Sequence, residues 1–316
     1  MKRAAARLGG LRTIVACAAV LAVITLALAA ASCTRGAPAG GPSARAGPAR
    51  VVVLSPALAV TMRDLGLDDL VVGRHGYDMV LPKSVPVCGD QAGIDYEALL
   101  ATKPTHVLVE WGSRPLPERL RDLAAEHSWK VTTSTLLTLD QIESSGAAVI
   151  RELAPEGDRA ASEAALARLR QSWTKRGEYA GAGRVLLVMG TTPVCSVLGP
   201  GSCHQEILER IGGVPAIRDG SPYMELDAED VARLAPGAIV ILSPRAPDAA
   251  PAEKSWPELE RRLGPLARLN IPAVRDRRVA LIDYPLVLLP STSLSVYAEE
   301  LATKLQWWRE APPGGE

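Results

Sequence analysis

The chain has 316 residues, of which 47% are hydrophobic, and it carries 35 basic against 35 acidic side chains. This apolar fraction is typical of a globular protein and excludes a largely disordered one. The zero formal charge argues against a nucleic-acid-binding protein, which usually carries a clear basic excess. Five Cys in a chain of this length do not make a disulfide-rich scaffold.

The first 32 residues have the features of an export signal. Residues 1–12 contain four basic side chains and no acid, and residues 13–32 contain no charge. The apolar run ends at Ala30-Ala31-Ser32-Cys33, which resembles a bacterial lipobox, although Ala30 stands where that motif prefers Leu. We expect a signal peptide over residues 1–32 and a lipid on Cys33. Plain secretion and an uncleaved anchor are the alternatives, because about 20 apolar residues can span a bilayer.

Residues 33–49 follow the expected cleavage point and are dominated by Gly, Pro and Ala. Such a segment buries too little apolar surface to fold, so it is predicted to be a flexible tether. The folded part is expected to begin near Arg50, outside the cytoplasmic membrane. Without residues 1–32 the chain loses four positive charges and no negative ones, so a protein with a net charge of −4 remains.

Residues 50–157 alternate between strand and helix patterns. β-Branched or apolar runs predict strands at 51–54, 70–73, 105–110 and 129–133, and helical patterns occupy 57–65 and 94–101. Thr138 and Gln141 have the spacing of a capping box, which predicts a helix running to about Leu153. Strands that alternate with helices in this way are typical of βαβ units with a parallel sheet.

Residues 158–180 carry no strand pattern. Ala161, Ala165, Leu169 and Trp173 recur every four residues between charged positions, which predicts one long helix of about 30 Å. Residues 181–316 return to an alternating pattern, with strands at 184–189, 238–242 and 279–282 and helices at 204–211, 228–234 and 292–308. We therefore predict an α/β fold of two lobes, each with a central, mostly parallel sheet, joined by one long α-helix. No internal sequence repeat is recognised.

Common enzyme and metal motifs are missing from the sequence. It contains no GxSxG, P-loop, HExxH or CxxC pattern, and its Gly clusters do not match GxGxxG. The four His residues are scattered. We expect His106 and His127 to be packing or surface residues, and we expect neither catalytic residues, nor a bound metal ion, nor a resident cofactor.

Aromatic residues occur where ligands of open α/β sheets bind, beyond the carboxyl ends of strands. Tyr77, Trp111, Tyr223 and Tyr284 each fall in such a predicted loop, although aromatics make up only 4% of the chain. Flat aromatic rings suit large, planar, partly apolar ligands. The alternative is that each ring covers the edge of its own core. Ser55 and His75 lie in the same set of loops.

Several ordered segments resemble the binding proteins for vitamin B12, ferric siderophores and haem that serve ABC importers. They are RVVVLSPALAVTMRDLGLDDLVVG (50–73), DYEALLATKPTHVLVEWG (95–112), RVLLVMG (184–190), GPGSCHQEILERIGG (199–213), LDAEDVARLAPGAIVIL (226–242) and LNIPAVRDRRVALID (269–283). Thr105 replaces the usual Asp of the second segment. The resemblance implies a ligand cleft between the two lobes, an iron or cobalt chelate as ligand, an importer permease as partner, no catalysis and a monomer.

The resemblance also implies roles for individual residues. Tyr77, Trp111 and Tyr223 match aromatic positions that face ligand, and Arg74 and Arg114 become candidates for binding anionic groups. Glu97 and Glu229 match one exposed Glu on each lobe that docks onto the permease, where a pair of separated charges fixes orientation. The alternative is that both are ordinary solvated helix charges.

Three Cys remain for the folded part of an exported chain. Cys195 and Cys203 flank one loop at the edge of the expected cleft, so a disulfide between them is predicted, with Cys88 left as a buried thiol. A lipid-anchored binding protein is the leading hypothesis. An enzyme on the same scaffold, which would need a cluster such as His75, Cys88 and His204, and a sensor lipoprotein without transport are the alternatives.

Overall fold

The computed structural model describes residues 47–310 except 91, 113 and 175. The predicted signal peptide, Cys33 and all of the tether except its last three residues lie outside this range. The chain divides into two units, Met1–Pro48 and Ala49–Glu316, and everything below concerns the second. In the described part of the chain, no helix has both the length and the hydropathy needed to cross a bilayer.

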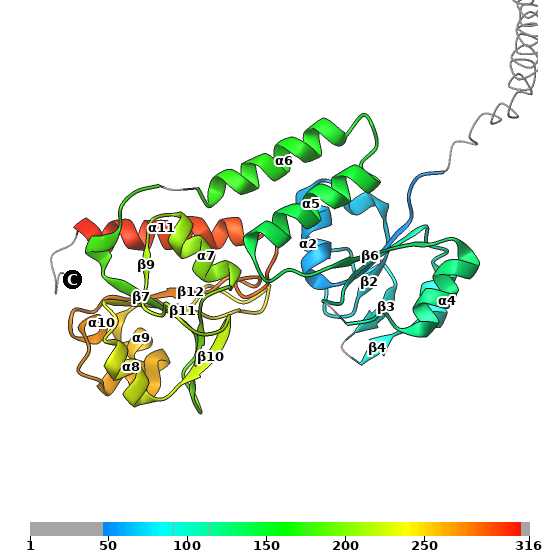
Figure 1. The fold of residues 1–316 in the computed structure, drawn as a ribbon. Helices are drawn as coiled ribbons and strands as arrows, with labels where there is room; N and C mark the ends of the chain where they lie inside the picture. The colour runs from blue at the N-terminus through cyan, green and yellow to red at the C-terminus, as the bar shows by residue number, and fades with distance from the viewer. Residues whose placement is uncertain (1–46, 91, 113, 175, 311–316) are drawn as a thin grey trace, which may run out of the picture. The chain divides into compact units, whose positions relative to one another are not determined.

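The N-terminal lobe is a six-stranded sheet flanked by helices (Figure 1). Its strands lie in the order β4 (Gly93–Ile94), β3 (Val87–Asp90), β2 (Val71–His75), β1 (Val51–Leu54), β5 (His106–Glu110) and β6 (Lys130–Ser134). All neighbours are parallel except the short β3–β4 pair. The helices are α2 (Pro56–Asp64), α3 (Tyr96–Ala101) and α4 (Glu118–His127), with a 3₁₀ turn at Asp68–Leu70.

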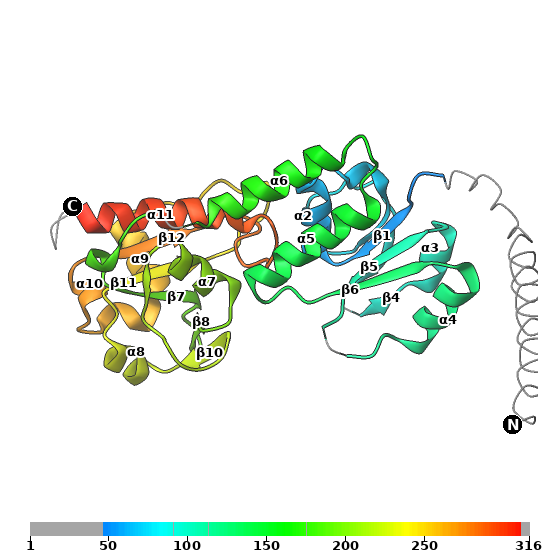
Figure 2. The same ribbon diagram turned by 45° about the horizontal axis from the view of Figure 1, so that its top comes forward.

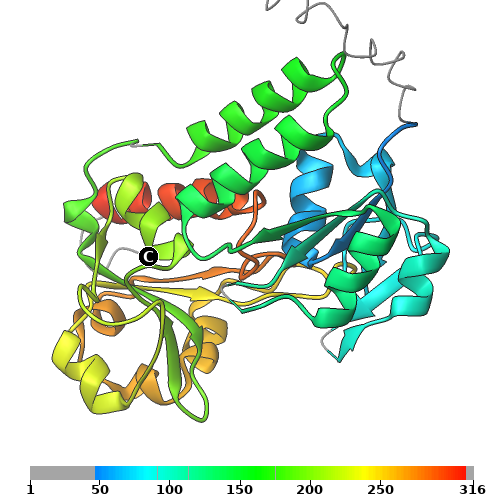
Figure 3. The same ribbon diagram turned by 45° about the vertical axis from the view of Figure 1, so that its right-hand side comes forward.

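Two helices connect the lobes, and they lie side by side in the views of Figures 1 to 3. Helix α5 (Leu139–Leu153) begins with the predicted capping box between Thr138 and Gln141. Helix α6 (Arg159–Ser172) is shorter than predicted, because Trp173 leaves the helical path and is only 1% exposed in the core.

The buried face of α6 is wider than the predicted one. Ala165 and Leu169 pack against the core as predicted, Ser162 and Leu166 are buried beside them, and Ala161 is exposed. A polar residue can occupy this face because the Ser162 hydroxyl donates a hydrogen bond to the Leu65 carbonyl, at 2.8 Å.

The C-terminal lobe holds the second sheet, in the order β10 (Tyr223–Leu226), β8 (Cys195–Leu198), β7 (Arg184–Gly190), β11 (Ala238–Leu242) and β12 (Val279–Ile282). The short β9 (Val214–Pro215) also pairs with β7. Strand β8 is antiparallel to both neighbours, so this sheet is mixed. The helices are α7 (Cys203–Arg210), α8 (Ala228–Leu234), α9 (Trp256–Leu263), α10 (Pro272–Arg275) and α11 (Leu294–Glu310), with 3₁₀ turns at Ala180–Ala182 and Gly264–Arg268.

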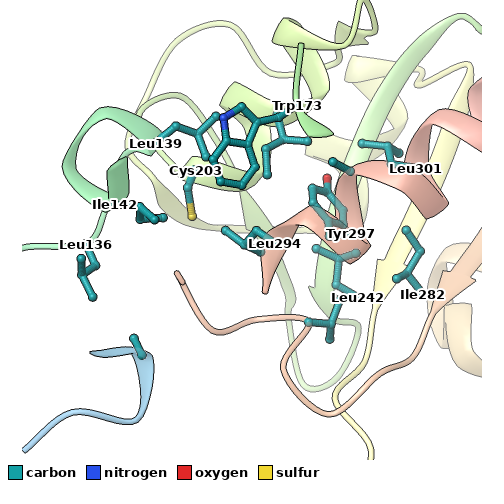
Figure 4. Packing of buried hydrophobic residues seen from close by; sticks show 14 of the residues in the cluster. Leu136, Leu139, Ile142, Trp173, Cys203, Leu242, Ile282, Leu294, Tyr297 and Leu301 are labelled. Carbon is teal, nitrogen blue, oxygen red and sulfur yellow. The ribbon is translucent and has the colours of Figure 1, made fainter. Parts of the chain in front are cut away.

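One apolar cluster runs through both lobes. Figure 4 shows Leu139 and Ile142 of α5 with Trp173, Cys203, Leu294 and Tyr297 in this cluster, which also includes Val51 and Leu58 of the N-terminal lobe. Polar contacts join the same elements: the Leu139 amide donates to Glu206 at 2.7 Å, and the Thr292 hydroxyl donates to Asp64 at 2.5 Å. The lobes are therefore tied by packing as well as by the connecting chain.

The two lobes contain equivalent strand–helix–strand units, and these carry a short sequence repeat that the sequence analysis missed. Asp95 is the N-cap of α3 and Asp227 the N-cap of α8, and each is followed by Glu at the second helical position. Nine residues after each Asp stands a Pro, and the residue before it, Lys103 or Ala235, has a positive φ of 47° or 42°. The repeat is short because only three features require particular residues in both lobes: the helix N-cap, the turn after the helix and the buried strand that follows.

Candidate ligand-binding site

The carboxyl ends of β1, β2, β3 and β5 meet at one edge of the N-terminal sheet and line a cavity of about 390 Å³. Ser55 follows β1 directly, caps α2 by accepting from the Leu58 amide at 3.3 Å, and donates its hydroxyl to Glu110 Oε2 at 2.8 Å. Because β1 and β5 are neighbouring parallel strands, both residues arrive at the same edge. The Ser55 hydroxyl orients the Glu110 carboxylate at the cavity wall.

His75 ends β2 and also lines this cavity. Its Nδ1 accepts a hydrogen bond from the Tyr77 amide at 3.1 Å, so the neutral ring carries its proton on Nε2. Burial lowers the pKa of His75, while the charges of Asp90 and Asp78 oppose that shift. The ring therefore offers a neutral N–H donor near pH 7.

Tyr77 is 58% exposed, and its ring centroid lies 5.7 Å from that of His75. Trp111 lines the cavity together with Arg114, whose guanidinium lies 4.7 Å from the indole centroid. The Trp111 Nε1 donates to the Pro115 carbonyl at 2.9 Å, which fixes the ring. The cation–π contact places a positive charge on one face of the indole, and Arg114 remains exposed to solvent.

Arg74, a predicted anion-binding residue, is buried in the structure. It is only 6% exposed, and its guanidinium donates to the carbonyls of Val85 and His75 at 2.9 and 3.3 Å. These two bonds hold the loop after β2 against the sheet. The sequence shows the position of an Arg but not the direction of its side chain, and the anion-binding role of Arg74 stays a prediction.

The two tyrosines of the C-terminal lobe have different surroundings. Tyr223 opens β10 and is 49% exposed. Burial, together with the charges of Cys203 and Glu110, raises the pKa of its phenol.

Tyr284 instead packs against the central cluster, and its hydroxyl donates to the Ser293 carbonyl at 3.2 Å. It lines a separate hollow with residues of α2, α6 and α11. The structure thus places Tyr284 in the core edge, the alternative that the sequence had left open, and not with the other candidates.

The predicted disulfide is not formed, because Cys195 and Cys203 are both free thiols. Cys195 points from β8 into the cluster on one side of the sheet, with Val197, whereas Cys203 opens α7 in the cluster on the other side. Burial raises the pKa of Cys195 to about 11 and that of Cys203 to about 12. Cys88 is a buried free thiol, as expected.

Glu97 and Glu229 occupy equivalent exposed positions, each in the first turn of a helix with an Asp N-cap. Neither carboxylate makes a hydrogen bond or ion pair within the described residues. One exposed, unpaired Glu at the same position of each lobe is compatible with a two-point docking surface, and the docking role stays a prediction.

Two acidic residues of the cavity were missed as candidates. Asp90 ends β3 and Glu110 ends β5, and both line the cavity with exposed carboxylates. A sequence signal was present for Glu110, which ends the strand predicted at 105–110, whereas no strand was predicted to end at Asp90. With Arg74 turned away, the polar wall of the cavity is more acidic than predicted.

His75, Cys88 and His204, the cluster named for the enzyme alternative, do not come together in the structure. His204 is fully buried in the C-terminal lobe, where its Nε2 lies 2.8 Å from the Val287 carbonyl. Cys88 packs in the core of the N-terminal sheet, and only His75 reaches the cavity. Among residues 47–310, with the three gaps given above, no cluster of His, Cys, Asp and Glu could hold a metal ion.

A scan against protein-family models and a search of curated proteins find no match to the chain. Solved structures do match. The vitamin B12 binding protein BtuF of Vibrio cholerae has a TM-score of 0.62 at 20% identity, over 84% of this chain and 99% of that one. A periplasmic haem-binding protein of Pseudomonas aeruginosa has a TM-score of 0.58 at 23% identity, over 84% and 95% of the two chains.

The protein has the fold of the periplasmic solute-binding proteins. A possible iron-binding solute-binding protein of Staphylococcus epidermidis shares it as well, with a TM-score of 0.61 at 14% identity and coverage of 81% and 98%. Each comparison structure is covered almost end to end, so the two-lobed α/β architecture predicted from the sequence is confirmed.

Proposed function

We propose that the protein is an exported, lipid-anchored solute-binding protein that captures a metal chelate and delivers it to an ABC importer. The observation that carries this proposal is the cavity at the strand ends of the N-terminal lobe. Its wall combines the Trp111 ring with a few polar groups, and the exposed Tyr77 lies beside His75 of that wall, which is the usual composition of a small-molecule site. The shared fold and the ordered sequence segments support the same role.

The charges of the cavity favour a chelate whose rim carries N–H donors or positive charge. Glu110 and Asp90 present acceptors, His75 presents a neutral donor, and Arg114 is the one guanidinium of the described cavity wall. A ligand whose rim carries amide N–H groups or a positive charge would pair with these carboxylates, whereas a rim of several carboxylates would be repelled. Among the three expected chelates, an amide-rimmed corrinoid or a cationic ferric siderophore fits better than haem.

Titration calorimetry with cyanocobalamin, haemin and a cationic ferric hydroxamate tests this choice. We expect haemin to bind weakest to the native chain, and we expect Glu110→Gln to reduce the preference for the cationic chelate. Arg121→Glu, an exposed change on α4, is the matched control. Tightest binding of haemin would refute the charge argument, and binding of none of the three would refute the proposed function.

The docking role of Glu97 and Glu229 has a separate test. In Glu97→Arg and Glu229→Arg, chelate uptake by cells should fail while chelate binding by the purified protein stays unchanged. Glu118→Arg, an exposed acidic residue in the first turn of α4, is the control and should leave uptake intact. Uptake that survives both test substitutions would favour a sensor without transport.

A further inference from the structure

A groove of about 650 Å³ lies on the C-terminal lobe and shares no residue with the cavity at the strand ends of the N-terminal lobe. Helices α9 and α11 both contact β12, and residues of all three elements line the groove. Figures 1 and 2 show β12 running beside α11. The groove is larger than the N-terminal cavity, and its volume falls within the range of small-molecule sites, about 300–1,000 Å³.

The lining of the groove is mainly aromatic and apolar. Three of the six Trp residues of the chain contribute to it: Trp256, Trp307 and Trp308. Trp307 is 47% exposed, whereas Leu259 and the β12 residues 279–281 are buried. Because β12 is almost completely covered, its peptide groups are not accessible to an occupant. The side chains of the walls must therefore hold whatever binds in the groove.

The charged part of the lining is entirely positive. Lys254, Arg277 and Lys304 line the groove, and no Asp or Glu among the described residues does so. Lys254 lies 3.6 Å from Asp283 and 3.8 Å from Glu300, whereas Arg277 and Lys304 have no carboxylate partner in the described chain. Two unpaired cations beside apolar rings are complementary to an occupant that carries an anionic group.

Arg277 has a backbone conformation that Arg rarely adopts. Its φ is 52°, and it follows α10 at the left-handed position that usually carries Gly. The Arg278 amide donates to the Ala273 carbonyl at 2.8 Å, which is the hydrogen bond typical of this kind of helix end. The Arg277 guanidinium lies 5.5 Å from the Trp256 ring centroid, so a strained residue carries this charge to the groove. Backbone strain of this kind is common at ligand sites.

We propose that this groove is a second ligand site, which binds a small, flat, apolar molecule that carries a carboxylate. The apolar part of the ligand packs on Trp256 and Trp307, since flat aromatic faces suit planar groups. Its carboxylate pairs with Arg277 and Lys304 through charge-assisted hydrogen bonds. A neutral molecule of the same shape leaves both cations unpaired and binds more weakly.

The test is titration calorimetry of the protein with cinnamate and with its neutral analogue cinnamamide. We expect one-to-one binding of cinnamate with a Kd of about 1 mM or below, and at least about fivefold weaker binding of cinnamamide. Trp307→Ala should weaken cinnamate binding at least about fivefold, because it removes an apolar wall of the groove. Val296→Ala, an exposed residue of α11 outside the groove, is the matched control and should change Kd by less than about twofold.

Arg277→Gly separates a role in binding from a role in the fold. Gly adopts a positive φ without strain, so this substitution should leave the midpoint of thermal unfolding unchanged or raise it. It should nevertheless weaken cinnamate binding at least about fivefold, because it removes a charged donor. Lys103→Gly is the matched control, since Lys103 is an exposed cation with a φ of 47° after the end of α3. It should leave Kd within about twofold of the native value.

Four results would overturn the proposal. Three of them are the absence of saturable cinnamate binding, equal binding of cinnamamide, and insensitivity of cinnamate binding to both Arg277→Gly and Trp307→Ala. The fourth is self-association of the protein that Trp307→Ala abolishes, because a second copy of the chain would then cover the groove. Chelate binding by the Trp307→Ala protein should be unchanged, so the outcome is independent of the function proposed above.

Discussion

Trp173 offers the sharpest test of how the two lobes are held together. It is only 1% exposed, it lies in the cluster shared by both lobes, and its Nε1 donates to Glu143 Oε1 at 2.9 Å. Truncation to Ala removes a large buried side chain and leaves a cavity, which costs about 3–5 kcal/mol of unfolding free energy. The lost hydrogen bond adds little, because Glu143 keeps Arg170 at 2.8 Å and Arg210 at 3.6 Å.

The assay is urea unfolding followed by circular dichroism, with Trp173→Phe as the matched variant. Phe retains most of the packing and loses the indole donor, so we expect it to cost far less than the Ala variant. A loss below about 1 kcal/mol for Trp173→Ala would refute the view that this cluster joins the lobes. Separate unfolding of the two lobes in the native protein would refute it as well.

Three further predictions concern protons, thiols and caps. Burial lowers the pKa of His204 to about 4, against 6.5 for an exposed ring. Between these two pH values the unfolded chain binds more protons than the folded one, so the free energy of unfolding should fall as the pH drops from about 6.5 towards 4. His204→Gln should flatten that slope in unfolding measurements at pH 7.5 and 4.5, and an unchanged slope would contradict the assignment. Burial covers Cys88, Cys195 and Cys203 and raises the pKa of each thiol, so all three should resist alkylation in the folded protein. In urea all three should react, as mapped by mass spectrometry. If a Cys195–Cys203 disulfide were present, only Cys88 of the three would react. Thr138→Ala should cost about 1 kcal/mol of unfolding free energy because it removes the capping box of α5, whereas Thr174→Ala, beyond the end of α6, should cost less.

The sequence by itself determined the local elements and their order. The ranges of β1, β11, β12 and α8 agree with the prediction residue for residue, because buried apolar runs and caps depend on neighbours in the chain. The capping box at Thr138 was predicted for the same reason. The end of α6 was not, since nothing local stops the helix at Ser172; the core takes up Trp173 instead.

Only the tertiary structure decided which candidate side chains share the cavity. It brings Ser55, Glu110 and His75 together because three parallel strands end at one edge. It turns Arg74 inward, packs Tyr284 against the edge of the core, and places Cys195 and Cys203 on opposite sides of a sheet. The direction of a side chain depends on contacts between residues far apart in the chain, and a single sequence does not record them.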